Sequence, residues 1–198
     1  MDKQECLGCI VTLFILVFCG YTYYEKEGFE LKCLVASKDG NNYCVRERSK
    51  LDDAANLLAI VTEKCKQLVK YVQEQDPEKD AVKRLIKGYN PNKIMETLPT
   101  SKYTAYSENK GEKLAFCLNK ENDGTKLIDI NTLTFVAIHE LSHIMTTSEG
   151  HKQEFWKNFK FLLEQAKAAN IYNPVDYKKN PEPYCGMDIT DNPYYDFK

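Results

Sequence analysis

All three histidines of this 198-residue chain fall between positions 139 and 151, and two of them stand four positions apart. His139 and His143 lie in the run Ala137-Ile138-His139-Glu140-Leu141-Ser142-His143. On a helix, side chains four positions apart lie about 40° apart around the axis and one turn along it. Both imidazoles therefore reach a single ion from one face, and this spacing predicts a helix that carries a metal site.

The third ligand has to come from beyond this helix. Imidazole nitrogens suit zinc, and a catalytic zinc keeps three protein ligands and one open position. His151 follows Gly150, which can take the backbone conformation that ends a helix and turns the chain back. Glu140 lies too far around the helix to join the chelate, but it can take a proton from a water on the metal. We expect Zn²⁺ on His139, His143 and His151, with Glu140 as the catalytic residue.

These motifs resemble the zincin metallopeptidases, in particular the WLM and SprT-like group. That group pairs His-Glu-x-x-His with a downstream Gly-His and then Glu-Phe, and this chain has Gly150-His151-Lys152-Gln153-Glu154-Phe155-Trp156. The resemblance covers about Tyr103 to Ala169, and the chain is also similar to membrane-anchored metallopeptidase candidates of large DNA viruses. It implies an α+β, zincin-like fold with helices packed on a small, mainly antiparallel sheet. It also implies hydrolysis of a protein or peptide substrate.

The resemblance further implies that the strand at 113–118 can present its edge to an extended substrate, and a plain sheet strand is the alternative. The alternative to a peptidase is a catalytically inactive zincin-like module with a structural or interaction role at a membrane. A DNA-directed activity is not expected, because 27 basic and 29 acidic side chains give a net charge of −2. Nucleic-acid binders usually show a basic excess or stripe, so we expect no nucleic-acid partner.

Residues 6–24 contain no charged side chain. As a helix this run would be about 28 Å long, close to the thickness of a bilayer core. It predicts an N-terminal transmembrane helix within a membrane anchor at 1–24, and hence a single-pass protein of a host or virion membrane if the source is viral. A cleaved signal peptide and a buried core helix are the alternatives, and the orientation stays open.

The remaining chain divides into a metallopeptidase domain at 25–170 and a tail at 171–198, rich in Pro and Tyr, that packs on it. Turn residues and hydrophobic periodicity predict the elements. They are a hairpin within 25–48, helices at about 49–75, 79–87, 129–146 and 151–170, and strands at 103–106 and 113–118. Asp129 or Asn131 caps the third helix, and 88–101 is expected to be a connecting loop.

Cys33 and Cys44 can close a small loop, and the five cysteines beyond the anchor leave at least one thiol free. Cys185 is a candidate zinc-blocking thiolate in a latent form, against the simpler alternative of a buried or unpaired thiol. Tyr177 or Tyr184 can supply a phenol to the oxyanion, although ordinary packing is favoured for both.

Two acidic residues complete the candidate set. Glu149 is an alternative third ligand, less favoured than His151. Glu154 stands close after His151 in the sequence and can orient that ring, and a solvated helix face is the equal alternative.

Overall fold

The computed structural model describes residues 11–21, 31–121 and 126–196. It is a mixed α+β fold with small sheets, in agreement with the predicted class. The strands are β1 (Leu31–Val35), β2 (Asn42–Arg46), β3 (Ile94–Glu96), β4 (Ala105–Glu108), β5 (Lys113–Phe116), β6 (Glu182–Tyr184) and β7 (Met187–Ile189). The labelled helices are α2 (Leu51–Gln75), α3 (Asp80–Gly88), α4 (Ile130–Met145), α5 (Gln153–Ala168) and α6 (Pro193–Asp196).

The predicted membrane anchor is corrected by the structure. Its described part, residues 11–21, is helical, and eleven residues at 1.5 Å each span only about 16 Å. None of the helices in the described ranges combines the length and the apolar character needed to cross a bilayer. The expected transmembrane helix and single-pass localisation are therefore overturned, and residues 1–10 and 22–24 of the predicted anchor lie outside the described residues.

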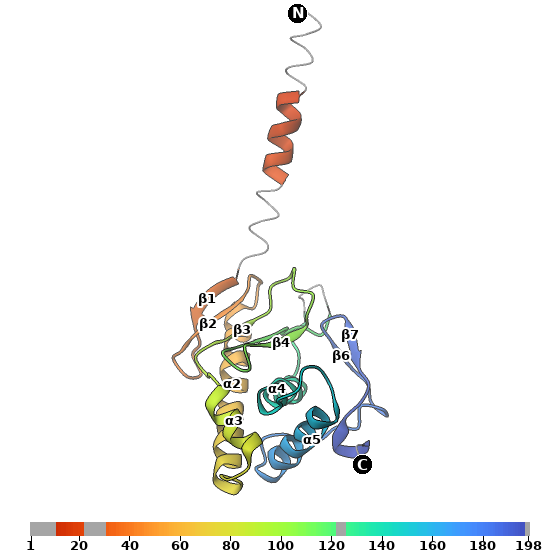
Figure 1. Cartoon of the computed structure of the whole chain (residues 1–198). Coiled ribbons are helices and arrows are strands. Elements are labelled where there is room, and N and C mark those ends of the chain that lie inside the picture. The colour runs from red at the N-terminus through yellow and green to blue at the C-terminus, as the bar shows by residue number, and fades with distance from the viewer. Residues whose placement is uncertain (1–10, 22–30, 122–125, 197–198) are drawn as a thin grey trace, which may run out of the picture.

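Helix α4 runs through the middle of the fold, with α2, α3 and α5 packed against it (Figure 1). Its apolar residues explain this position, since Leu133, Ala137 and Leu141 are fully buried. The N-terminus is capped by Asp129, whose carboxylate accepts hydrogen bonds from the backbone N–H groups of Asn131 and Thr132 at 3.0 and 2.9 Å. Of the two predicted caps, the structure selects Asp129.

The main sheet has the order β3-β5-β4, with β5 parallel to β3 and antiparallel to β4. Since β5 has a partner on each side, the predicted strand at 113–118 has no edge to offer a substrate, and that prediction is wrong. The strands at the two edges of this sheet are β3 and β4, and β4 packs near α4. Strand β3 was missed, because three residues between turn signals look like part of a loop.

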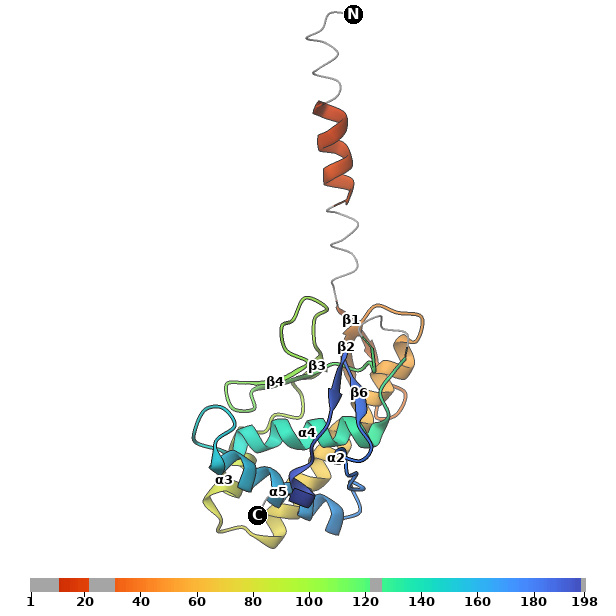
Figure 2. The same ribbon diagram turned by 90° about the vertical axis from the view of Figure 1, so that its right-hand side faces the viewer.

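The C-terminal segment returns to this sheet. The hairpin of β6 and β7 is joined to it by the Cys117–Cys185 disulfide and by a 2.9 Å hydrogen bond from Cys185 N to Asn119 O. Figure 2 shows this hairpin beside α4. The division at 25–170 and 171–198 stays a prediction.

The second disulfide joins Cys33 and Cys44, which are partners in the β1–β2 ladder. This pairing confirms the predicted small loop. Cys65 keeps a free thiol that is buried on α2.

Candidate metal centre

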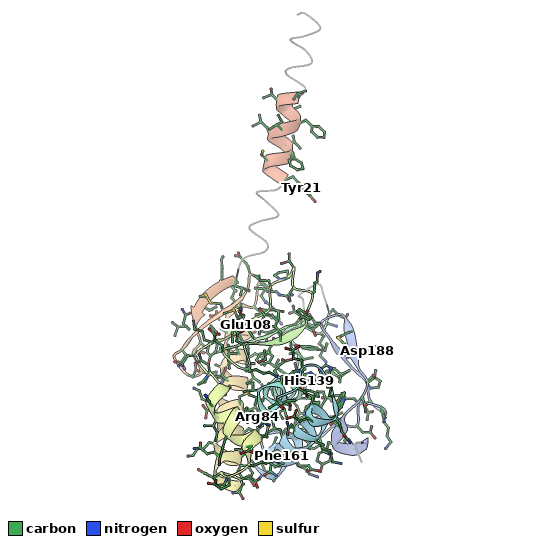
Figure 3. The ribbon with its side chains drawn as sticks, viewed as in Figure 1. Tyr21, Arg84, Glu108, His139, Phe161 and Asp188 are labelled. Carbon is green, nitrogen blue, oxygen red and sulfur yellow. A yellow bond between two sulfur atoms is a disulfide. The ribbon has the colours of Figure 1, made fainter. Side chains whose placement is uncertain are left out.

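The three histidines converge although they come from two parts of the fold. His139 and His143 project from neighbouring turns of α4, and His151 lies just before α5. Their Nε2 atoms are 3.3 Å apart between His139 and His143, 3.0 Å between His139 and His151, and 3.2 Å between His143 and His151. Figure 3 labels His139 near the middle of the folded region. This cluster could hold a metal ion.

The donor set fits an ion such as zinc. A tetrahedral ion with metal–nitrogen bonds of about 2.0–2.1 Å places its ligand nitrogens about 3.3 Å apart. The observed separations are close to this value. Desolvation by burial, followed by the neighbouring imidazoles, lowers the pKa of His139 to about 3. Desolvation likewise lowers the pKa of His143 to about 4, and it lowers that of His151. The rings are therefore neutral at physiological pH, which is the form that binds metals.

Phe155 forms an apolar support for all three rings. Its ring centroid lies 4.8, 4.4 and 4.6 Å from those of His139, His143 and His151, and its side chain is fully buried. Phe155 comes from the first turn of α5, so the packing of α5 against α4 also places the rings. An aromatic support of this kind restricts the ring orientations and keeps water from one side of the cluster.

Glu140 is adjacent to His139 on α4 and is only 4% exposed. Desolvation by burial raises the pKa of its carboxyl group to about 8. A carboxyl group with a pKa near neutrality can both accept and donate a proton under physiological conditions.

Two adjoining hollows meet at these residues. One, of about 530 Å³, lies between the β4–β5 hairpin and α4, and it is lined by Glu140, all three histidines and Lys110. The other, of about 500 Å³, shares His139, Glu140 and His151 and is closed by the C-terminal hairpin through Met187 and Ile189. The clustered imidazoles therefore open onto a cleft bordered by β4 on one side and by the β6–β7 hairpin on the other.

The two acidic candidates, Glu149 and Glu154, lie at different points around the histidines, and neither is part of the cluster of ligand atoms. The ligand atoms that cluster belong to the three histidines, and Glu149 lines the first hollow without joining that cluster. Glu154 turns to the backbone of Thr147 and Ser148, and their N–H groups lower the pKa of its carboxyl group to about 2. It therefore holds the segment before His151, and within the described part of the chain its hydrogen bonds and ion pair go to Thr147, Ser148 and Arg84.

The remaining candidates are accounted for by packing and cross-linking. The Tyr184 hydroxyl donates to the carbonyl oxygen of Thr104 at 3.1 Å, at the wall of the second hollow. Tyr177 is buried, with its ring 5.0 Å from that of Phe135. Cys185 is bonded to Cys117, so the hypothesis of a zinc-blocking thiolate is wrong.

The sequence reasoning missed Arg84 and Lys110, which bind the last carbonyl groups of α4 and the segment after it. Both are distant from the histidines in sequence, and a basic residue in a helix or turn carries no local signal of such a role. In the sequence Phe155 stood out as part of the Glu-Phe motif, and its contact with the rings followed only from the fold.

Comparisons with known proteins find similarity to viral proteins. No family model matches it. It is 28% identical over 191 residues to an uncharacterized protein of Acanthamoeba polyphaga mimivirus, covering 94% of each chain. It is 30% identical over 82 residues to an uncharacterized protein of Invertebrate iridescent virus 6, covering 41% of this chain and 44% of that protein. This similarity agrees with the predicted resemblance to viral proteins, and it carries no information on their activity, since both relatives are uncharacterized.

Among solved structures, the chain is similar to the crystal structure of Wss1 from Saccharomyces cerevisiae. The TM-score is 0.46 at 17% sequence identity, and the match covers 62% of this chain and 84% of Wss1. A likeness of this size carries no argument about chemistry, so the assignment to the WLM and SprT-like group stays a prediction.

Proposed function

We propose that the protein is a zinc-dependent peptidase in which His139, His143 and His151 hold the ion and Glu140 is the general acid/base. The observation that carries the proposal is the convergence of three Nε2 atoms, 3.0–3.3 Å apart, beside a buried carboxyl group in one cleft. Three neutral nitrogen donors from a helix and a following connection are typical of a catalytic zinc site, which leaves a coordination position for chemistry.

Zinc held by these three histidines would act as a Lewis acid, which would polarise a carbonyl group and lower the pKa of a water molecule to about 7. Glu140 accepts the proton of the attacking water on a carboxylate oxygen. As the C–N bond breaks, the same oxygen returns that proton to the leaving amine nitrogen. Burial supports this double role, because desolvation raises the pKa of the Glu140 carboxyl group toward neutrality.

The cleft favours an extended peptide as substrate. Strand β4 lies at the edge of its sheet, and residues of β4 line both hollows. A peptide can add to such an edge through main-chain hydrogen bonds while its side chains enter the adjoining hollows. The side formed by Phe135, Met187 and Ile189 is apolar and suits an apolar side chain of that peptide.

The test compares the wild type with Glu140→Gln, a change that keeps the size of the side chain and removes its ability to accept the proton. Cleavage of a denatured protein or a peptide library is measured together with the zinc content of each protein. We expect bound zinc in both and cleavage by the wild type alone. Glu164→Gln, an exposed position on α5, is the matched control and should cleave like the wild type.

Equal cleavage by the wild type and Glu140→Gln would refute the role of Glu140. Absence of cleavage by either protein, with zinc bound, would favour the inactive module. The metal assignment has a separate control, since His151→Ala should lose the zinc that the wild type retains. Full retention of zinc in that variant would refute the ligand set.

A further inference from the structure

The segment that carries His151 is held by charged side chains from three separate elements. We call residues 146–152, between α4 and α5, the connector. Its backbone and the end of α4 are bound by Arg84 of α3, Lys110 of the β4–β5 turn and Glu154 of α5. Gly150 and His151 themselves are exposed, so packing alone restricts the end of the connector little.

Glu154 binds the first half of the connector. Its carboxylate accepts hydrogen bonds from the N–H groups of Thr147 and Ser148, both at 3.1 Å, and from the Thr147 hydroxyl group at 2.9 and 2.8 Å. Hydrogen bonds to an ionised acceptor are stronger than those between neutral groups. Glu154 therefore fixes two successive peptide groups shortly before His151.

Arg84 joins this carboxylate to the end of α4. Its guanidinium group lies 3.3 Å from a carboxylate oxygen of Glu154, and its Nε donates to the carbonyl oxygen of Met145 at 2.7 Å. The same residue therefore contacts the last residue of α4 and the first turn of α5. Figure 3 labels Arg84 on α3.

Lys110 binds the connector from the side of the cleft. Its ammonium group donates to the carbonyl oxygen of Thr146 at 2.8 Å and lies 3.4 Å from those of His143 and Ser148. A cation at this position binds carbonyl groups at and just beyond the C-terminal end of α4 and is favoured by the helix dipole.

We propose that Glu154, Arg84 and Lys110 are positioning residues that hold the connector in the conformation in which His151 meets His139 and His143. This inference rests on the proposed metal site, and it concerns the residues that set the affinity of that site for zinc. If the connector were free, binding of an ion would have to order it at a cost in conformational entropy. Because these side chains already hold it, the third imidazole is in place before the ion arrives.

The test measures the dissociation constant for Zn²⁺ by competition with a chromogenic chelator, in the full chain. Glu154→Gln replaces the charged carboxylate that accepts the hydrogen bonds of Thr147 and Ser148 with a neutral amide. Lys110→Met removes the cation but keeps an unbranched side chain. Loss of partners that orient metal ligands typically weakens metal affinity by about 10–100-fold, and we expect a change in this range for each variant. Glu164→Gln, exposed on the same helix as Glu154, should bind zinc like the wild type.

A cobalt-substituted sample gives a second readout that a purely structural role would not change. Its visible absorption depends on how much cobalt the site holds and how that ion is coordinated. At equal cobalt concentration, Glu154→Gln and Lys110→Met should therefore lose absorption toward the level of His151→Ala, the variant expected not to retain the ion. Zinc affinities within twofold of the wild type, or wild-type cobalt spectra in both variants, would overturn the proposal. An equal loss of affinity in Glu164→Gln would overturn it too. Failure of the wild type to bind zinc would instead refute the proposed function.

Discussion

Replacement of Gly88 with alanine tests whether the β4–β5 turn is fixed against the helices. Gly88 is the last residue of α3, and a Cβ atom there would lie 2.4 Å from the carbonyl oxygen of Lys110 and 2.6 Å from Cγ2 of Ile144. Ordinary contacts begin above 3.4 Å, so the turn has to retreat by about 1 Å. This movement would also displace the Lys110 ammonium group from the carbonyl groups of the connector.

The expected change in the free energy of unfolding of Gly88→Ala is the balance of two opposing effects. Alanine is favoured over glycine within a helix by about 1 kcal/mol. Forcing an extra methyl group into a packed site costs about 1–3 kcal/mol, and the upper end applies where a backbone group has to move. We therefore expect Gly88→Ala to lower the free energy of unfolding by about 1–2 kcal/mol, measured by urea denaturation.

Gly40→Ala is the matched control. Gly40 has φ +73° and no atom within 4 Å of an added Cβ, so its replacement costs about 1–2 kcal/mol of backbone strain without any clash. It lies in the β1–β2 turn, away from the histidines. We expect Gly88→Ala alone to weaken zinc binding. Wild-type stability and zinc affinity in Gly88→Ala would refute the reasoning, because the turn would then be free to move.

Two further predictions concern the cross-links and the pH. Replacing both Cys117 and Cys185 with alanine removes a cross-link between residues 68 positions apart and should lower the free energy of unfolding, measured in urea, by about 4 kcal/mol. The same change at Cys33 and Cys44, which are 11 positions apart, should cost about 3 kcal/mol, because a shorter loop restricts the unfolded chain less. The reverse order would contradict this chain-entropy argument. Zinc affinity, measured by chelator titration, should stay constant as the pH falls through neutrality, because burial lowers the pKa of all three histidines and protons compete for the rings only at lower pH. A tenfold loss of affinity per pH unit already above neutrality would contradict this, since it would show that the free site is protonated there.

Local patterns in the sequence predicted the elements that carry the site. The helix expected at 129–146 is Ile130–Met145, and the one expected at 151–170 is Gln153–Ala168. Hydrophobic periodicity and capping residues act over a few turns, so a single sequence reveals them. The meeting of the histidines was also predictable, because the fixed spacing on α4 and the glycine before His151 left few geometries.

The features that the sequence did not reveal depend on pairing between distant segments. The central position of β5 depends on β3, which is too short to give a pattern of its own. The Cys117–Cys185 bond and the contacts of Lys110 with the connector likewise join residues that are far apart along the chain. The predicted transmembrane helix is not borne out, because none of the helices in the described ranges is long and apolar enough to cross a bilayer; an uncharged run alone did not decide this.

The position of the chain's single tryptophan gives the protein an intrinsic optical probe. The indole ring of Trp156 lies 5.7 Å from the His151 ring and 5.3 Å from that of Phe155. Its fluorescence emission therefore originates beside the imidazole cluster, without interference from any other indole. Quenching by a paramagnetic ion such as Cu²⁺ would follow occupancy of the cluster in real time, and stopped-flow mixing would give the association and dissociation rates on unlabelled protein.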